Sequence, residues 1–421
     1  MNVVVIGSGG REHAICESIA KSKKIKKLFC IPGNGGTASI ANNIELNLNN
    51  FREIKNFVKS NKVDLVIVGP EKPLVEGICD YLEKYKIKVF GPSKFASKLE
   101  GSKIFTKKIC KKYEIPTAKF DIQYNKKDSY NYLHKAKYPL IIKADNLAAG
   151  KGVYICNNKK EALIAVNEIF DGKFGKARQI LFEEFLVGEE MSYFVISDGS
   201  TFKFFGSAQD HKRVLEGDRG KNTGGMGSYS PSRLFSKSLE KKIIEKIIKP
   251  TFRALKDKKQ KFKGFLYAGL MVCNNEPYLI EYNVRMGDPE CQTILPNLKS
   301  DFLDILEASC KNNLSKKKII WHKKKSICIV LCSKGYPNKF RSNVELKNLN
   351  EIKKSKNEYI FHAGTVKKNS KYFSDGGRVL NFVSSSLNLS KSRKQILKTI
   401  SDLNWKNGYF RKDIGYKVID K

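Results

Sequence analysis

The segment with the clearest chemical content runs from position 281 to position 290. Side chains alternate along an extended strand, so Glu281, Asn283 and Arg285 are expected to face one way. Carboxylate and amide oxygens suit a Mg²⁺ ion bound jointly with nucleotide phosphates, and Arg285 adds a cation for a phosphate or carboxylate. The apolar run 265–272 offers no acid, so we expect the protein to supply only those two oxygen ligands. A solvated polar strand is the alternative, which the apolar neighbouring runs disfavour.

A glycine-rich turn follows the first apolar run, with Gly9 and Gly10 leading into Arg11 and Glu12. Such a turn offers backbone N–H groups and a positive helix end to an anion. A dinucleotide-binding fingerprint would need a third glycine at position 12 and an acid after the second strand, and both are missing. Arg11 instead favours a single sugar phosphate, because a guanidinium binds phosphate oxygens bidentately. A tight turn without a ligand is the alternative.

A lysine and a loop of small residues form a third candidate site. Lys143 ends an apolar run, and Gly150-Lys151-Gly152 follows shortly after it. Small residues allow backbone amides to approach phosphate oxygens closely, so lysine and loop together could bind nucleotide phosphates. The Walker pattern is absent, since no Gly-Lys pair is followed by Ser or Thr. For Lys143 alone, a solvated lysine is the better interpretation.

The segment 183–190 connects two predicted strands and is typical of a hinge between lobes. Backbone groups near Glu184, Phe185 and Leu186 could bind the edge of an adenine, and Glu190 could bind ribose hydroxyls. No Gly-x-Ser-x-Gly elbow and no cysteine–histidine spacing indicates a nucleophile. The candidate residues instead suit the positioning and charge neutralisation of a phosphoryl group.

The hydrophobic pattern predicts four units that would position these residues. Residues 1–100 alternate short apolar strands with helices, which is typical of a parallel sheet with crossover helices. Residues 101–190 and 191–325 form the next two units, of which the second contains the predicted metal pair. Residues 326–421 form a last, small unit with strands. Single helices are predicted over 74–85 and around 238–256.

Composition excludes some classes of protein. The chain has 421 residues, of which 41% are hydrophobic and 29% are charged, as in a folded globular protein. No apolar run approaches the roughly 20 residues needed to cross a bilayer, and the apolar start is too short for a signal peptide. The ten cysteines lack zinc-site spacing, so we expect reduced thiols and a cytoplasmic location.

The formal net charge of +37 has two interpretations. A nucleic-acid partner is one. Compositional drift is favoured, because the lysines are dispersed along the chain and neither a groove-reading motif nor an aromatic RNA platform is found. We therefore expect no specific nucleic-acid or membrane partner, and a moderate attraction for phosphorylated substrates.

Over essentially its full length, the chain resembles the phosphoribosylamine–glycine ligase family of the ATP-grasp superfamily. Residues 285–292, Arg-Met-Gly-Asp-Pro-Glu-Cys-Gln, are close to the family signature, and segments such as 5–13, 32–37, 222–231 and 411–415 also match. Asn146 stands where the family usually has glycine, which would stiffen the phosphate loop slightly. The resemblance implies a multidomain α/β and α+β fold. It would comprise an N-terminal Rossmann-like parallel sheet, a two-lobed ATP-grasp core and a small C-terminal β-rich domain.

The resemblance also implies a reaction and a set of roles. ATP, glycine and 5-phosphoribosylamine would give glycinamide ribonucleotide, ADP and phosphate through a glycyl phosphate, in purine biosynthesis. Arg285, Lys143 and Asp210 would be catalytic, and Mg²⁺ or Mn²⁺ would bind Glu281 and Asn283 in a monomeric enzyme. The residues implied to bind ATP are Lys103, Lys143, Gly150, Lys151, Gly152, Glu184, Phe185, Leu186 and Glu190. Those implied to bind the other substrates are Gly9, Gly10, Arg11, Glu12, Lys212 and Arg285.

Asp210, Lys212 and the stretch 224–227 would close over the substrates and exclude water, which would otherwise hydrolyse the acyl phosphate. Another ATP-grasp ligase with a different acid substrate is an alternative. The segments 7–12 and 288–290 argue against it.

Overall fold

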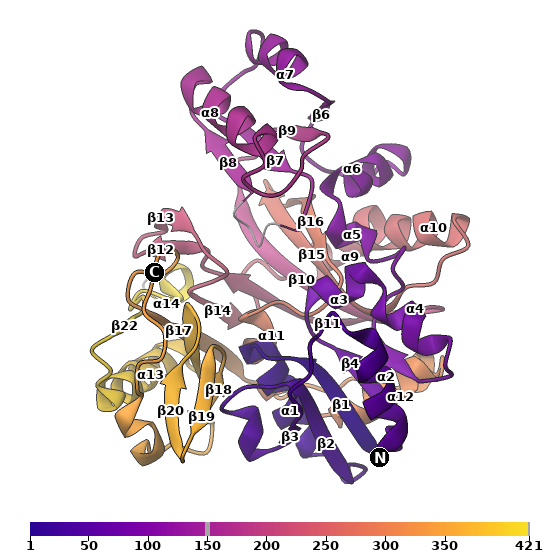
Figure 1. Cartoon of the computed structure of the whole chain (residues 1–421). Helices are drawn as coiled ribbons and strands as arrows, with labels where there is room; N and C mark the ends of the chain where they lie inside the picture. The colour runs from indigo at the N-terminus through magenta and orange to yellow at the C-terminus, as the bar shows by residue number, and fades with distance from the viewer. Residues whose placement is uncertain (148–151, 420–421) are drawn as a thin grey trace.

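The computed structural model describes residues 1–147 and 152–419. Figure 1 shows the N-terminus at the bottom of the molecule and, at the top, a projecting lobe that contains β6 to β9, α7 and α8. The described residues form three larger sheets, of five, four and nine strands.

The N-terminal unit is built on a five-stranded parallel sheet. Its strands are β1 (Asn2–Gly7), β2 (Lys27–Pro32), β3 (Asn42–Asn43), β4 (Leu65–Val68) and β5 (Val89–Phe90), in the order β3-β2-β1-β4-β5. Its helices are α1 (Gly10–Ala20), α2 (Phe51–Ser60), α3 (Glu71–Glu76) and α4 (Ile78–Glu83). Val3 to Ile6 of β1 are fully buried, as expected where both faces of a parallel sheet are covered. The predicted parallel sheet is confirmed.

The prediction of one helix over 74–85 is wrong. Gly77 adopts a φ of +98°, the left-handed conformation that ends α3 and lets α4 begin in a new direction.

The projecting lobe follows α5 (Lys98–Gly101) and α6 (Lys103–Lys112). It contains an antiparallel sheet in the order β6-β9-β7-β8 and two helices. The strands are β6 (Phe120–Gln123), β7 (Leu140–Ala144), β8 (Val153–Cys156) and β9 (Ile180–Glu184), and the helices are α7 (Lys126–Leu133) and α8 (Lys159–Phe170). Apolar residues of both helices and of the sheet form a core of their own, separate from the other two cores.

A large, mostly antiparallel sheet crosses the rest of the molecule. Its first strands, in spatial order, are β16 (Glu276–Asn283), β15 (Lys263–Cys273), β10 (Glu189–Asp198), β11 (Phe202–Asp210) and β14 (Gly227–Ser230). The sheet continues through β17 (Lys325–Ser333), β21 (Arg378–Ser386) and β18 (Glu358–His362). Strands from either side of position 326 therefore belong to one continuous sheet.

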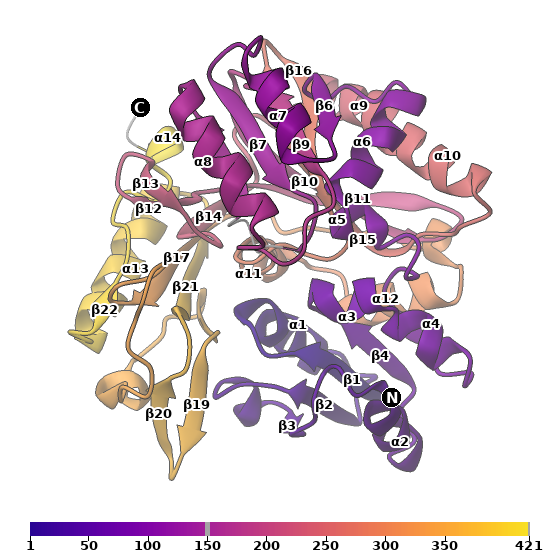
Figure 2. The same cartoon turned by 45° about the horizontal axis from the view of Figure 1, so that its top comes forward.

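Helices cover both faces of this sheet. The predicted helix around 238–256 consists of α9 (Lys237–Ile243), a π-helical segment over Ile244–Ile248 and α10 (Lys249–Asp257). On the other face, α11 (Glu290–Ile294) lies at the centre between the sheet and α1, as Figure 2 shows, followed by α12 (Phe302–Cys310). The remaining elements are β12 (Arg213–Leu215), β13 (Arg219–Asn222), β19 (Thr365–Lys368), β20 (Lys371–Ser374), α13 (Leu389–Leu403), β22 (Gly408–Tyr409) and α14 (Tyr416–Ile419).

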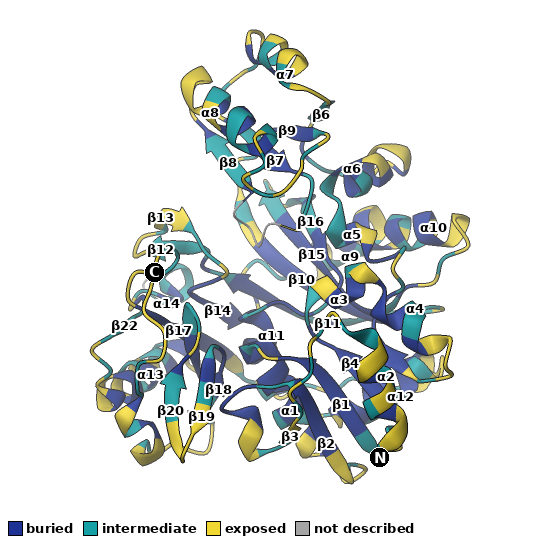
Figure 3. Ribbon diagram, viewed as in Figure 1, coloured by how far each residue is buried: buried dark blue, intermediate teal, exposed yellow. Residues whose placement is uncertain are grey.

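Two apolar cores join the N-terminal unit to the large sheet. One contains Val3 of β1, Phe265 of β15 and Phe382 of β21, and the other contains Val4 of β1 and Tyr282 of β16. Figure 3 shows the buried residues concentrated along the central strands. The base is therefore packed as one body, and the projecting lobe is the part with an independent core.

Candidate active site

The two predicted metal ligands share one face of β16. Tyr282 between them points to the opposite face, where it is buried and its hydroxyl is hydrogen-bonded to Thr251. Glu281 lies opposite Gly269 of the neighbouring strand. A Cβ atom at Gly269 would lie 3.3 Å from Cγ of Glu281, so the glycine leaves room for this carboxylate.

A second group of charged residues lies on the same side of the large sheet. Lys212 Nζ is 2.6 Å from Glu190 Oε2, and this ammonium lowers the pKa of Glu190. Burial raises the pKa of Asp210 to about 7, with the carboxylates of Glu290 and Glu190 adding to the effect and Lys212 opposing it. Asp210 therefore exchanges a proton near neutral pH.

Glu290 was not among the predicted site residues, although it lies within the 285–292 signature. Its side chain is 3% exposed, and its Oε1 is 3.1 Å from the hydroxyl of Ser192 on β10. A Cβ atom at Gly287 would lie 2.2 Å from Oε2 of Glu290, so the glycine is needed to admit this carboxylate. The position of Glu290 within the polar segment 285–290, three residues after Gly287, was the available signal.

Three lysines gather where α6 meets the projecting lobe. Lys143 Nζ lies 3.0 Å and Lys107 Nζ 3.4 Å from the carboxylate of Glu183. The side chains of Lys143, Lys107 and Glu183 are buried. Lys103 Nζ donates to the carbonyl oxygen of Asn146 at 3.0 Å. Burial lowers the pKa of Lys103 and Lys107, and the Lys143 ammonium contributes in both cases. Sequence reasoning assigned no role to Lys107, which stood in no motif, or to Glu183, which was considered only as the start of the hinge segment 183–190.

These lysines carry more positive charge than their neighbours neutralise. Within the described part of the chain, Glu183 is the one carboxylate at ion-pair distance from any of the three ammonium groups. The carboxylate of Glu281 opposes the lowering of the pKa of Lys103 by burial, so Lys103 and Glu281 of β16 lie within electrostatic range of each other. A buried excess of positive charge favours an anionic ligand such as a phosphate.

The ends of the predicted phosphate loop are held in place. Gly150 and Lys151 lie outside the described residues, whereas Gly152 accepts a hydrogen bond from Ala144 N at 2.9 Å. Asp145 accepts hydrogen bonds from Ser102 Oγ and Ile104 N, both at 3.0 Å, at the start of α6. Asn146 Nδ2 donates to Phe174 O, and the expected stiffening of the loop at this position stays a prediction.

The predicted adenine hinge connects β9 to β10. The Glu184 carboxylate accepts a hydrogen bond from Lys119 N at 2.8 Å, so this side chain supports the hinge. Phe185 is 39% exposed and Leu186 is half-buried, which leaves the connection accessible. The backbone around Phe185 and Leu186 is thus better placed than Glu184 to meet a ligand.

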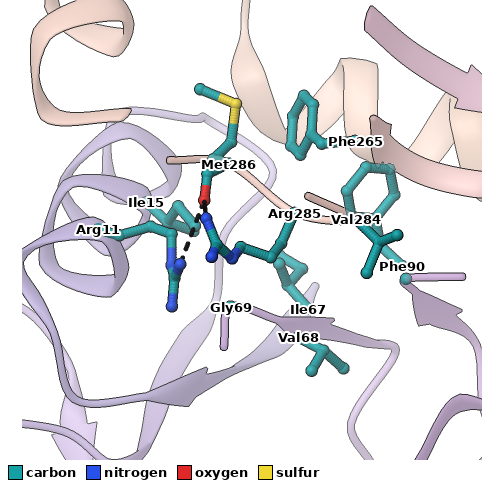
Figure 4. Close-up of a pocket in the computed structure, with 11 residues that line it drawn as sticks. Arg11, Ile15, Ile67, Val68, Gly69, Phe90, Phe265, Val284, Arg285 and Met286 are labelled. Atoms are coloured by element: carbon teal, nitrogen blue, oxygen red, sulfur yellow. Dashed lines mark hydrogen bonds between the residues drawn. The ribbon is translucent and has the colours of Figure 1, made fainter. Parts of the chain in front are cut away.

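Arg285 and Arg11 meet at the junction of the N-terminal unit and the large sheet. Both guanidinium groups donate to Met286 O, at 3.1 and 3.2 Å (Figure 4). Arg285 Nη2 is 2.7 Å from Glu100 Oε1 and 3.0 Å from Asn283 Oδ1, and its Nε is 3.3 Å from Glu71 Oε2. The cavity beside them measures about 10 Å³, roughly the space of one water molecule. This cavity is therefore too small for a substrate-sized molecule.

The pKa values of the two glutamates at this junction, Glu100 and Glu71, are shifted in opposite directions. Burial raises the pKa of Glu100 to about 7, although Arg285 opposes the shift. Burial acts in the same direction on Glu71, but Arg285 and Arg11 together lower the pKa of Glu71 to about 2. Glu71 is thus a permanent anion between two cations.

The glycine turn before α1 already binds carboxylates. Gly9 N donates to Glu12 Oε2 at 2.7 Å, and Arg11 N donates to Asp288 Oδ2 at 3.2 Å. Glu12 is 1% exposed, and a Cβ atom at Gly69 would lie 2.1 Å from its Oε1. The N–H groups of Gly9 and Arg11, predicted to bind a phosphate, are therefore hydrogen-bonded to carboxylates of the chain itself.

Three family models match successive parts of the chain. Residues 1–100, 101–291 and 326–417 match the models described as the phosphoribosylglycinamide synthetase N domain, ATP-grasp (A) domain and C domain. The chain belongs to the phosphoribosylglycinamide synthetase family. The resemblance stated from the sequence is confirmed.

Relatives match this phosphoribosylglycinamide synthetase chain from end to end. A phosphoribosylamine–glycine ligase of Agrobacterium fabrum is 42% identical over 100% of this chain and 99% of its own. A phosphoribosylamine–glycine ligase of Fusobacterium nucleatum is 42% identical over 99% of this chain and 98% of its own. The solved phosphoribosylamine–glycine ligase of Thermotoga maritima is 30% identical, covers 99% of this chain and 100% of its own, and has a TM-score of 0.85.

The two-lobed core has the ATP-grasp fold, as predicted. The biotin carboxylase domain of a 2-oxoglutarate carboxylase from Hydrogenobacter thermophilus, 16% identical, covers 95% of this chain and 89% of its own with a TM-score of 0.69. Among the described residues, no helix is long and apolar enough to cross a membrane.

The donor set on β16 suits an ion shared with a substrate. The described residues contain no group of three or more His, Cys, Asp and Glu side chains that could hold a metal. Asn283 Oδ1 accepts a hydrogen bond from Arg285 and keeps a second lone pair. Two protein oxygens fit Mg²⁺, which retains waters and binds substrate phosphates in preference to a full protein cage.

Proposed function

We propose that this chain joins glycine to 5-phosphoribosylamine by way of glycyl phosphate. Its family and its full-length relatives make it an ATP-dependent ligase that forms a C–N bond in purine biosynthesis. The observation that supports the phosphorylated intermediate is the excess of positive charge around Lys103 and Lys143, because Lys143 shares the Glu183 carboxylate with Lys107 and Lys103 donates to a backbone carbonyl. That charge suits a phosphoryl group in transfer.

The chemistry needs the phosphate because a carboxylate is a poor electrophile without a good leaving group. An oxygen of the glycine carboxylate attacks the γ-phosphorus of ATP, and the bond to ADP breaks. The sugar amine then attacks the carbonyl carbon, and phosphate leaves with the former carboxylate oxygen. The amine loses a proton in this step, and one C–N bond is formed for each ATP consumed.

ATP would lie between the projecting lobe and the large sheet. Lys103, Lys143 and the loop Gly150-Lys151-Gly152 would bind its phosphates. The backbone of Phe185 and Leu186 would meet the adenine, supported by the Glu184 carboxylate. Glu190, held by Lys212 at 2.6 Å, would bind the ribose. Mg²⁺ or Mn²⁺ held by Glu281 and Asn283 would neutralise phosphate charge.

The other two substrates would meet near the centre of the large sheet. The turn Gly9–Glu12 would hold the hydroxyl and amine groups of phosphoribosylamine, because Glu12 supplies acceptors there. Asp210 would accept the amine proton, since its pKa of about 7 is near the working pH. Arg285 would bind the glycine carboxylate, and Lys212 would help to close the site.

Oxygen transfer tests the intermediate directly. With glycine labelled by ¹⁸O in its carboxylate, we expect one ¹⁸O atom in each phosphate released when ATP and phosphoribosylamine are present. Phosphate without label would reject glycyl phosphate. Glu281→Gln should reduce the rate of this ¹⁸O transfer at least about 100-fold. The control is Glu276→Gln, because Glu276 lies on the same strand and pairs with surface lysines. It should leave the rate unchanged.

We further propose a monomeric, cytoplasmic enzyme with the four units 1–100, 101–190, 191–325 and 326–421. All ten cysteines are free, and eight of them are buried, which agrees with a reducing compartment. Analytical ultracentrifugation at several protein concentrations tests the monomer, and a second species at higher concentration would contradict it.

A further inference from the structure

A fully buried arginine near the C-terminus stands outside the site described above. Arg411 is 0% exposed, and its Nε and Nη2 lie 2.7 Å from the two oxygens of Asp413. Its Nη1 lies 2.7 Å from Asp218 Oδ1 and 3.0 Å from the carbonyl oxygen of Arg213. A buried charge is stable only when it is paired and hydrogen-bonded, so this position requires both carboxylates.

Asp218 belongs to the turn between β12 and β13, so Arg411 joins this hairpin to the C-terminal segment. Lys417 Nζ at 2.9 Å and the Tyr416 hydroxyl at 3.0 Å bind the second oxygen of Asp218. Gly217 N donates to Asp413 at 2.8 Å, and the Tyr409 hydroxyl donates to Val214 O at 2.7 Å. The first strand and the turn of the hairpin are therefore fastened to the C-terminal segment.

The hairpin is directly connected to the site through Lys212. Arg213, whose carbonyl Arg411 binds, is the next residue in the chain. The backbone N–H and hydroxyl of Thr223, which follows β13, both donate to Lys212 O at 2.8 Å. Lys212 in turn holds Glu190. Any movement of the hairpin is thus transmitted to this lysine.

We propose that Arg411, with Asp218 and Asp413, is a clamp that holds the β12–β13 hairpin and Lys212 over the site and keeps water from the activated glycine. Arg411 is a positioning residue in this scheme. The inference rests on the proposed glycyl phosphate and on the proposed role of Lys212.

A loosened clamp has a defined chemical consequence. Water attacks the carbonyl carbon of glycyl phosphate, the bond from that carbon to the phosphate oxygen breaks, and glycine and phosphate are released. The sum is hydrolysis of ATP to ADP and phosphate without a new C–N bond. The ratio of phosphate released to glycinamide ribonucleotide formed therefore reports water entry. Loss of folded protein lowers both quantities equally and leaves the ratio unchanged.

Asp218→Asn removes the hairpin's charge with little change of shape, and Tyr416→Phe removes one hydroxyl bonded to it. The matched control is Glu345→Gln, a carboxylate of the C-terminal unit paired with Lys371 at 3.5 Å and distant in sequence from the hairpin. We expect the phosphate-to-product ratio to rise from about one to about two or more in Asp218→Asn. A smaller rise is expected in Tyr416→Phe, and none in the control.

Amide hydrogen exchange in the ligand-free protein is measured in parallel. Residues 213–223 should exchange at least about tenfold faster in Asp218→Asn than in the unchanged protein or the control. The clamp is refuted if Asp218→Asn exchanges rapidly but keeps a phosphate-to-product ratio of about one. It is also refuted if residues 213–223 of this variant exchange at the unchanged rate. The proposed function fails separately, because it is refuted by missing ¹⁸O transfer in the unchanged protein.

Discussion

Two buried lysines share one carboxylate but differ in their other neighbours. Lys107 Nζ also lies 2.5 Å from Thr117 Oγ1 and 3.4 Å from Ala118 O, so its remaining contacts are with the protein backbone and a hydroxyl. Lys143 ends β7 beside the predicted phosphate loop. The first lysine is therefore expected to support the fold, and the second to meet the nucleotide.

Lys143→Met should lower kcat/KM for ATP by about 100-fold or more, because a cation that stabilises the transferred phosphoryl group is lost. Lys107→Met should keep kcat/KM close to that of the unchanged protein. It should instead lower the free energy of unfolding by about 1–3 kcal/mol, because buried acceptors lose their donor. Steady-state kinetics and urea unfolding separate the two effects. Equal losses of activity in both variants would contradict the assignment.

The pKa of Asp210 allows a prediction of how activity depends on pH. Its pKa is raised to about 7, first by burial and then by Glu290 and Glu190. As a base it acts when ionised, so kcat should rise with pH through about 7 and then level off. Asp210→Asn should be slower and lose this inflection. A profile with the same inflection in the variant would assign it to another group.

The raised pKa of Asp210 also determines how the stability of the folded protein changes with pH. The unfolded chain ionises Asp210 near its usual pKa of about 4, whereas the folded protein keeps the proton up to about pH 7. The folded state therefore binds more protons between these values, and the contribution of Asp210 to stability falls as pH rises through this window. Relative to the unchanged protein, Asp210→Asn should gain stability from pH 5 to pH 8 in urea unfolding.

At the scale of elements, the projecting lobe differs from the base. Its apolar core is confined to α7, α8 and the β6–β9 sheet, whereas the other cores join distant segments of the chain. Its links to the base include polar contacts such as those from Asp145 to Ser102 and Ile104. A lobe with its own core can move or open without unpacking the rest.

Hydrogen exchange should reveal this independence. We expect amides of β7, β8 and α8 to exchange faster than those of β1 and β10, and to be protected by a non-hydrolysable ATP analogue, which bridges lobe and base. In Lys143→Met the protection by the analogue should decrease. Uniform exchange across the lobe and the base would contradict an independently opening lobe.

At the scale of the whole molecule, the net charge of +37 attracts anionic substrates. Raising the salt concentration from about 50 to about 300 mM shortens the range of this attraction. KM for ATP should therefore increase severalfold, whereas KM for glycine, a zwitterion without net charge, should change little. Equal changes for both substrates would indicate a general effect of salt on the enzyme.

The period-two pattern was enough to predict much of the local structure. Alternation on β16 places Glu281 and Asn283 on one face whatever the rest of the chain does, because side chains of a strand alternate. Short apolar runs ending in glycine or proline predicted the N-terminal parallel sheet. The break at Gly77 was missed, since the apolar pattern continues across it and a glycine's φ is not visible in sequence.

Contacts between distant segments were decided by the tertiary structure alone. The ion pair of Arg411 with Asp218 joins residues 193 positions apart, and Glu183 meets Lys107 and Lys143 from three different elements. Arg285 was predicted to continue the strand of Glu281 and Asn283 and to face a ligand. It lies two residues beyond the end of β16 instead, and Glu100 and Glu71 bind it. Side-chain period is a property of the local backbone and is encoded locally. Charge pairing depends on which elements pack together, and that is fixed only when the whole chain has folded.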